Sequence, residues 1–212
     1  MTRVLLVEDH DLFRHGLRRM LESAGVDVVG ESRDAEEALE LLEDRRPDVI
    51  LMDLNLPGMT GIDATHRVSG RIHAPAVIAL TVSAADDDVI HAIDAGAVGY
   101  LLKDATAPDI VRAVHAAAAG KSVLAPEAAT ALIARVRRGE APGHDDEEGP
   151  AFSQRELDVL RLLVAGRENA EIAEELYLSP TTVKHHLTAI FRKLGVGNRV
   201  QAVIQAVWRG VV

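Results

Sequence analysis

The stretch Val49-Ile50-Leu51-Met52-Asp53 places four consecutive apolar residues directly before a carboxylate. So short and so apolar a run is typical of a strand that is buried on both faces of a parallel sheet. Four further runs have the same character, at 4–7, 26–29, 76–80 and 98–102. Amphipathic, helix-like segments alternate with them, at about 10–24, 34–44, 60–70, 84–95 and 106–119. Five βα repeats predict a five-stranded, doubly wound parallel sheet with helices on both faces.

Residues with N-capping side chains stand at the start of several predicted helices. Asp34, Thr60 and Ser83 can each accept a hydrogen bond from the first turn of the helix that follows. We therefore expect all three to be N-caps.

The last 62 residues contain no strand-like run, and their apolar spacing predicts four helices. We place these helices at roughly 153–166, 169–176, 180–194 and 198–209. Ser153 followed by Glu156 forms a capping box, and Ser179-Pro180 supplies a cap and a first-turn proline. The second and third of these helices form a helix-turn-helix pattern.

Charge is distributed unevenly over the 212 residues, whose formal net charge is −10. Residues 1–124 carry a net −9 and residues 151–212 a net +2, which suggests two domains with different partners. Between them, glycine, proline and acidic residues replace the apolar periodicity. We expect a first domain at 1–122, a helix followed by an acidic Gly/Pro linker at 123–150, and an all-α helix-turn-helix domain at 151–212.

The composition excludes several classes of protein. The chain has no cysteine, which excludes disulfide scaffolds, zinc-thiolate fingers and thiol nucleophiles. The longest apolar stretch is too short to cross a bilayer, and the N-terminus resembles no secretory signal. We therefore expect a cytoplasmic protein with no membrane partner.

Polar residues follow the predicted strands at the sheet edge where ligands gather in parallel α/β folds. Glu8 and Asp9 follow the first strand, Asp53 the third, Thr81 the fourth and Lys103 the fifth. Three converging carboxylates repel one another unless a cation neutralises them, and oxygen ligands suit Mg²⁺. Lysine supplies a charge for a phosphoryl oxygen and threonine a hydroxyl donor, so one carboxylate can act as nucleophile and form an aspartyl phosphate.

Four segments carry this set, at 7–10 (VEDH), 51–61 (LMDLNLPGMTG), 80–83 (LTVS) and 99–104 (GYLLKD). They resemble the receiver domain of bacterial two-component response regulators, which has the flavodoxin-like, CheY-like fold. The resemblance implies that Asp53 accepts phosphate from a sensor histidine kinase. It also implies that Glu8, Asp9, Asp53 and the backbone carbonyl of Asn55 hold Mg²⁺. The resemblance further implies that Lys103 binds the phosphoryl group. By the same resemblance, Thr81 and Tyr100 respond to the bound phosphoryl group.

The segment 179–194 contains three cations and no acid, in contrast to the rest of the chain. Its apolar residues form one helical stripe, which leaves a polar, cationic face suited to the major groove. Ser179, Thr181 and Thr182 stand at its start, where hydroxyls and amides can contact phosphates.

With its flanking motifs, this half is similar to the LuxR-type DNA-binding domain, and the whole chain resembles the NarL/FixJ subfamily of response regulators. By that resemblance, Lys184, His185 and Thr188 face bases, and Thr182, Arg192 and Lys193 contact the DNA backbone. The last helix is implied to dimerise the DNA-bound form, through Val200, Val203, Ile204 and Val207. A homodimer on double-stranded promoter DNA follows.

The leading interpretation is a phosphorylation-switched transcription regulator and not an enzyme. A second interpretation keeps the DNA-binding output but has a ligand or partner protein control it without phosphorylation. The intact acid, threonine and lysine set argues against it. A third uses the carboxylates to hydrolyse an external phosphate ester, but the sequence offers neither a substrate-enclosing cap segment nor a second aspartate as general acid, because Asn55 stands two residues after Asp53.

Overall fold

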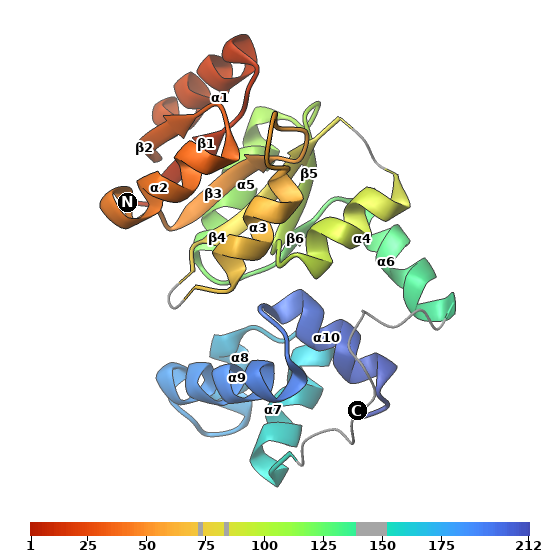
Figure 1. Cartoon of the computed structure of the whole chain (residues 1–212). Helices are drawn as coiled ribbons and strands as arrows, with labels where there is room; N and C mark the ends of the chain where they lie inside the picture. Colours follow the sequence, from red (N-terminus) through yellow and green to blue (C-terminus); the bar gives the residue numbers. More distant parts are fainter. Residues whose placement is uncertain (72–73, 83–84, 139–151) are drawn as a thin grey trace. The chain divides into compact units, whose positions relative to one another are not determined.

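The computed structural model of the chain describes residues 1–71, 74–82, 85–138 and 152–212 (Figure 1). These residues belong to two compact units, Met1–Leu132 and Ile133–Val212. The predicted acidic linker lies outside the described residues from 139 onward. The predicted helix before it is present as α6 (Pro126–Arg138).

The first unit is built on a parallel sheet of order β2-β1-β3-β4-β5-β6, which confirms the predicted doubly wound class. Its strands are β1 (Arg3–Val7), β2 (Asp27–Ser32), β3 (Val49–Asp53), β4 (Ala76–Thr81), β5 (Gly99–Leu102) and β6 (Val123–Leu124).

The predicted number of five strands is wrong, because β6 adds a sixth beside β5. Val123 donates its amide to the carbonyl of Val98, and Ala125 donates to Tyr100. A two-residue strand is too short to show any apolar alternation, and Pro126 follows it almost at once. Pro126 is also the first residue of α6, a position that proline favours.

Five helices connect the strands of the sheet, and each lies within two residues of its predicted range. They are α1 (Asp11–Ser23), α2 (Ala35–Arg45), α3 (Gly61–Ser69), α4 (Asp86–Asp94) and α5 (Ala107–Ala118). Asp34 and Thr60 accept hydrogen bonds from Glu37 and Asp63 and are N-caps as predicted. The prediction for Ser83 is wrong, because Ala85 is the N-cap of α4; Ser83 itself lies outside the described residues.

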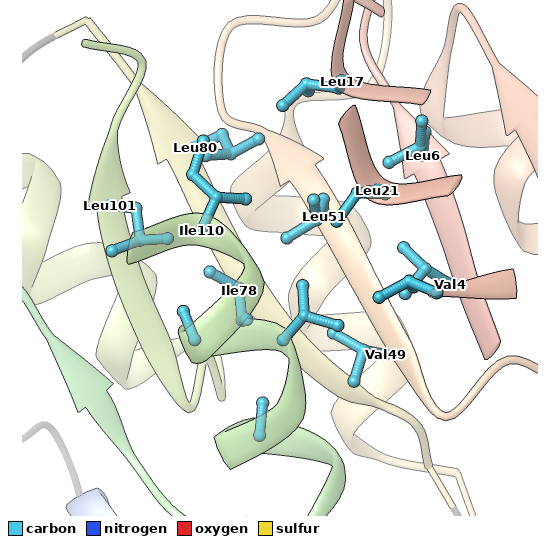
Figure 2. Packing of buried hydrophobic residues seen from close by; sticks show 14 residues of the cluster. Val4, Leu6, Leu17, Leu21, Val49, Leu51, Ile78, Leu80, Leu101 and Ile110 are labelled. Atoms are coloured by element: carbon cyan, nitrogen blue, oxygen red, sulfur yellow. The ribbon is translucent and has the colours of Figure 1, made fainter. Parts of the chain in front are cut away.

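The core consists of two layers, one on each face of the sheet. Figure 2 shows the layer in which α1 and α5 cover the strands, with Leu21 and Ile110 among its buried side chains. Helices α2 and α3 cover the opposite face, where Ile50 and Met52 are buried. Successive residues of β3 therefore enter opposite layers, which is why residues 49–52 are all apolar.

The second unit contains the four predicted helices: α7 (Gln154–Val164), α8 (Asn169–Glu175), α9 (Pro180–Leu194) and α10 (Arg199–Trp208). The predicted capping box at the start of α7 is present. One apolar cluster joins all four helices, and Leu160, Ile172, Ile190 and Ala206 are each almost fully buried in it. Among the described residues, no helix is both long and apolar enough to cross a membrane.

Candidate functional site

Four adjacent strands deliver the predicted polar residues to one edge of the sheet. Glu8 follows β1, Asp53 and Thr81 end β3 and β4, and Lys103 follows β5. Glu8, Asp53 and Thr81 are each only 1% exposed. The carboxyl ends of parallel strands lie at the same edge of the sheet. The four side chains therefore lie close together, as the sequence predicts.

The Lys103 ammonium group lies between two buried carboxylates. Its Nζ is 2.9 Å from Asp53 Oδ2, 2.9 Å from Glu8 Oε1 and 2.8 Å from Glu8 Oε2. Phe13 lies against it, with the ring centroid 5.2 Å from Nζ. Burial acts to lower the pKa of Lys103, but its hydrogen bonds to Glu8 and Asp53 outweigh burial and raise that pKa. The lysine therefore stays charged.

The turn after β3 fixes the carboxylate of Asp53. The backbone amide of Asn55 donates to Asp53 Oδ1 over 3.1 Å, which leaves Oδ2 for Lys103. Gly61 allows this turn, because a Cβ at that position would lie 1.9 Å from the backbone oxygen of Asp53. A larger residue at position 61 would force the chain away from the phosphoacceptor candidate.

Glu8, Asp9 and His10 bring three possible metal-ligand atoms within 4.8 Å of one another. Glu8 Oε2 contacts Lys103 as an ion pair but makes no hydrogen bond. Burial raises the pKa of Glu8, the hydrogen bond from Lys103 opposes this, and the charge of Asp53 raises the pKa further. With Asp53 nearby, the carboxylates outnumber the lysine, and this oxygen-rich donor set fits Mg²⁺.

Thr81 and Tyr100 lie on neighbouring strands and are both 1% exposed. Their side chains share a hydrogen bond. Burial raises the pKa of Tyr100 to about 12, although the bond to Thr81 acts in the opposite direction. Tyr100 is thus enclosed in the unit, with its hydroxyl tied to the end of β4.

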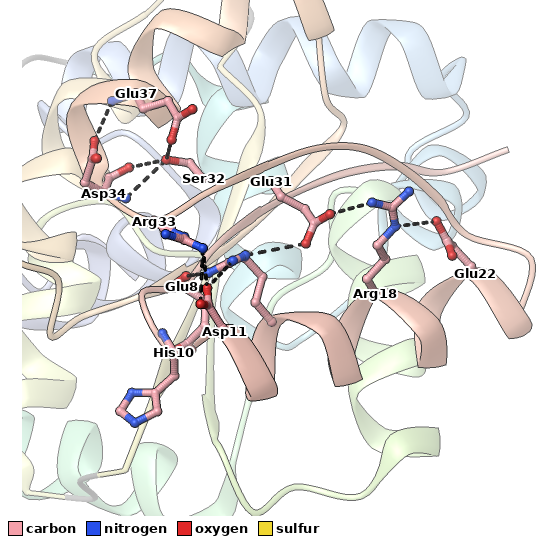
Figure 3. A network of polar contacts seen from close by, with 11 residues as sticks. Glu8, His10, Asp11, Arg18, Glu22, Glu31, Ser32, Arg33, Asp34 and Glu37 are labelled. Carbon is pink, nitrogen blue, oxygen red and sulfur yellow. Dashed lines mark hydrogen bonds and ion pairs between the residues drawn. The ribbon is translucent and has the colours of Figure 1, made fainter.

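A polar network behind the site was not predicted from the sequence (Figure 3). Arg14, only 5% exposed, donates to the backbone carbonyl of Glu8 over 2.7 Å and to Asp11 over 2.5 Å. Its Nε lies 3.5 Å from Glu31, which also pairs with Arg18 at 2.6 Å. The spacing of Asp11 and Arg14 is that of an ordinary surface pair on a helix, so the sequence carried no signal that Arg14 holds the Glu8 loop.

A cleft of about 460 Å³ opens beside the lysine. Its lining comes from three loops at the carboxyl edge of the sheet and from α1: His10, Phe13, Thr81, Val82, Leu102, Lys103 and Asp104. Val82 is 76% exposed at its rim. Lys103, whose side chain is 16% exposed, can thus be reached from solvent.

Helix α9 presents the predicted polar face of the second unit. Thr181, Lys184, His185, Thr188 and Arg192 are exposed, whereas the predicted apolar stripe is buried in the core. The N-cap is Ser179, which accepts from the Thr182 amide, and its hydroxyl lies 2.8 Å from the Thr182 hydroxyl.

Lys193 on α9 and three of the four predicted dimer residues on α10 are less exposed than the exposed α9 residues named above. Lys193 Nζ lies 2.6 Å from Glu156 Oε2 in the α7 capping box and 5.7 Å from the Phe152 ring centroid. In α10, Val200 is buried, Val203 and Ile204 are half-buried, and Val207 is 41% exposed.

Comparison with known proteins places both units. The family described as "Response regulator receiver domain" matches residues 4–115, and "Bacterial regulatory proteins, luxR family" matches residues 150–206. A receiver domain joined to a LuxR-type helix-turn-helix domain defines a two-component response regulator that acts as a transcription regulator.

Relatives match along nearly the whole chain. The transcriptional regulatory protein LiaR of Bacillus subtilis is 40% identical over 207 residues, which cover 97% of each protein. The nitrate/nitrite response regulator NarL of Escherichia coli is 36% identical over 206 residues, or 97% of this chain and 93% of NarL. The chain belongs to the NarL/FixJ family of response regulators.

Solved structures agree with this assignment. The response regulator ChrA of a heme-sensing two-component system is 36% identical, with a TM-score of 0.53 over 99% of this chain and 98% of ChrA. The two-component response regulator RcsB in a complex with DNA is 25% identical, with a TM-score of 0.58 over 98% of each chain.

Proposed function

We propose that this protein is a transcription regulator switched by phosphorylation of Asp53, with a sensor histidine kinase as the phosphoryl donor. The observation that supports this most is the position of Asp53, buried at the end of β3 with its Oδ2 2.9 Å from the Lys103 ammonium. A cation so placed can neutralise charge on a phosphoryl group bound to the aspartate. The cleft beside Lys103 gives a donor its approach.

The transfer step follows from this geometry. A carboxylate oxygen of Asp53 attacks the phosphorus of a phosphohistidine, the new P–O bond forms, and the P–N bond breaks. The bonding electrons leave with the kinase imidazole, which takes a proton from solvent. Lys103 then exchanges its carboxylate contact for a phosphoryl oxygen.

Glu8, Asp9, Asp53 and the Asn55 carbonyl are the residues that would hold Mg²⁺. The ion supplies positive charge that offsets the phosphoryl oxygens and the surplus of carboxylates. Arg14 supports this arrangement, since it fixes the backbone carbonyl of Glu8.

The signal passes through Thr81 and Tyr100 in this proposal. A phosphoryl oxygen near Asp53 draws the Thr81 hydroxyl toward it, which changes the partner of the Tyr100 hydroxyl. Because the ring is enclosed, this local exchange repacks the surface around α4 and β5.

The output is a dimer on promoter DNA. We assign residues 1–122 to the receiver and 151–212 to the DNA-binding domain, joined by 123–150. Helix α9 enters the major groove, with Lys184, His185 and Thr188 toward bases, and with Ser179, Thr181, Thr182, Arg192 and Lys193 toward phosphates. Val207 is the most exposed of the four proposed dimer contacts on α10. Promoter DNA and a kinase as partners imply a cytoplasmic location.

The test is intact mass after incubation with magnesium and acetyl phosphate, followed by sizing chromatography. We expect one added phosphoryl group and a shift toward dimer for the wild type, and no addition for Asp53→Asn. Asp27→Asn, at an exposed carboxylate on β2, is the matched control and should behave as wild type. An unmodified wild type, under conditions that phosphorylate another receiver, would contradict the proposal and favour control by a ligand or partner without phosphorylation.

A further inference from the structure

Tyr177 occupies the turn between α8 and α9 in an unusual backbone conformation. Its φ is +54°, and Arg46 is the one other non-glycine residue with positive φ in the described part of the chain. This left-handed region normally belongs to glycine at the end of a helix, because a Cβ there crowds the backbone. Six described helices in this chain end near a glycine with positive φ: Gly25, Gly96, Gly120, Gly166, Gly195 and Gly210.

Three hydrogen bonds to two neighbouring helices, α8 and α7, hold the turn in place. The Tyr177 amide donates to Glu174, and the Leu178 amide donates to Ala173 over 2.8 Å. From α7, Arg155 donates to the backbone carbonyl of Leu176 over 2.5 Å. The surrounding structure therefore imposes the left-handed conformation on whatever residue stands at position 177.

The side chain of Tyr177 contributes almost no packing to the fold. It is 96% exposed, the highest value among the large apolar and aromatic residues of the described chain. A glycine would make the same turn at lower conformational cost and would sacrifice no packing. An exposed aromatic ring on a rigid, strained turn indicates a residue kept for contact with another molecule.

We propose that Tyr177 is a further DNA contact, whose phenolic hydroxyl donates a hydrogen bond to a phosphate beside the N-terminus of α9. This inference rests on the proposed docking of α9 in the major groove. The tyrosine stands two residues before Ser179, the N-cap of that helix, and α9 carries no acidic residue to repel a phosphate.

The charge around the turn fits a neutral donor. The neighbouring helix α8 carries exposed carboxylates, and Arg167 lies 3.6 Å from Glu171 and 3.9 Å from Glu175. A lysine at position 177 would be drawn toward such carboxylates by its charge, whereas a neutral phenol is attracted less strongly and can still donate to a phosphate oxygen.

The experiment measures stability and DNA affinity in the same variants of the full chain. The probe is a duplex that the wild type selects from a random-sequence pool. Tyr177→Gly should raise Tm by about 4 °C or more, because the strain is relieved. The same variant should bind the duplex about tenfold more weakly, because a hydrogen bond to a charged phosphate is lost. Tyr177→Phe keeps the ring and should lose the same affinity.

A salt titration separates this contact from a cationic one. Lys184→Ala should weaken binding and reduce the slope of log affinity against log salt by about 0.9, since one cation is removed. Tyr177→Phe should leave that slope unchanged.

Each outcome decides a different claim. Wild-type affinity in both Tyr177 variants, with Lys184→Ala weakened, would overturn the tyrosine contact and leave the α9 interface standing. If those variants bind DNA normally but fail in transcription, the ring contacts a partner protein and the DNA proposal is wrong. If Lys184→Ala also binds normally, or no duplex is selected, the docking of α9 itself fails.

Discussion

Each half of the chain contains a lysine that contacts both a buried glutamate and an aromatic ring. In the receiver, Lys103 lies 2.8 Å from Glu8 Oε2 and over the Phe13 ring. In the DNA-binding half, Lys193 lies 2.6 Å from Glu156 and over the Phe152 ring. The local chemistry of the two sets is the same, yet burial and neighbours give them opposite electrostatic character.

The difference lies in the number of carboxylates. Asp53 stands beside Glu8, so Lys103 faces two acids, and burial together with Asp53 raises the pKa of Glu8. Hydrogen bonds from Lys193 and from the Ser153 amide instead lower the pKa of Glu156. A balanced ion pair ties two helices together. At the Lys103 site, the two carboxylates exceed the charge of the lysine. The site can therefore also bind a metal ion, and Lys103 can move to a phosphoryl group.

The largest expected effect comes from removing the two ammonium groups in turn. Lys103→Met keeps the length of the side chain but removes the charge that stabilises the transferred phosphoryl group. The initial rate of modification by acetyl phosphate should fall about 100-fold or more. Lys193→Met is the matched control and should be phosphorylated at the wild-type rate. Similar rates for all three proteins in a mass-spectrometric time course would show that Lys103 has no role in transfer.

For the free energy of unfolding, we expect the effect to come from Lys193→Met. Lys193→Met leaves the buried Glu156 carboxylate without its cation and should lower the free energy of unfolding of the second unit by about 1–2 kcal/mol. The value is modest because the Lys193 side chain is 27% exposed. Urea unfolding followed by fluorescence of Trp208, the one tryptophan of the chain, measures this. Arg192→Met, at an exposed neighbour, should change stability little, and an equal loss there would mean that the Lys193–Glu156 pair has no special role.

These paired lysines also show what the sequence could and could not predict. Glu8, Asp53 and Lys103 were predictable, because strand ends can be located from apolar runs and parallel strands align them. The contact of Lys193 with Glu156 was not, because it joins residues 37 positions apart on two helices. The prediction that Lys193 contacts the DNA backbone stays a prediction, and phosphate must now compete with Glu156 for the ammonium.

Two further features had no usable sequence signal. The buried position of Arg14 depends on how α1 lies against β2, which helical spacing does not specify. The left-handed turn at Tyr177 is set by hydrogen bonds from α7 and α8, and nothing about an isolated tyrosine indicates it. Strand β6 was missed for the related reason that its two residues are defined by pairing with β5 alone.

The opposite pKa shifts predict opposite responses to acid. The pKa of Glu156 is lowered in the folded state. Its contribution to stability is therefore present above pH 4.5, the ordinary pKa of glutamate, and is lost as pH falls through the folded pKa. The stability difference between wild type and Glu156→Gln should therefore shrink from about pH 5 downward. The pKa of Glu8 is raised in the folded state. Its contribution to stability is therefore fully present below pH 4.5 and is lost as pH rises through the folded pKa.

Urea titrations at several pH values, without magnesium, measure both differences against Glu156→Gln and Glu8→Gln. If the two stability differences changed with pH in the same direction, the proposed contrast would be wrong: the Lys193–Glu156 pair and the Lys103 site would not differ in charge balance.

The smallest effect concerns the two tyrosines, one in each half. Tyr177→Phe leaves Tyr100 as the single phenol of the chain, and its titration by tyrosinate absorbance should have a midpoint of about 12. Burial is the main cause, and the hydrogen bond to Thr81 acts against it. Adding Thr81→Val removes that bond and should move the midpoint higher still. Rapid pH jumps are needed so that absorbance is read before the receiver unfolds. A midpoint near the ordinary value of about 10 would mean that the Tyr100 ring is open to solvent, and the proposed route from Asp53 through Thr81 to an enclosed ring would then lack its last step.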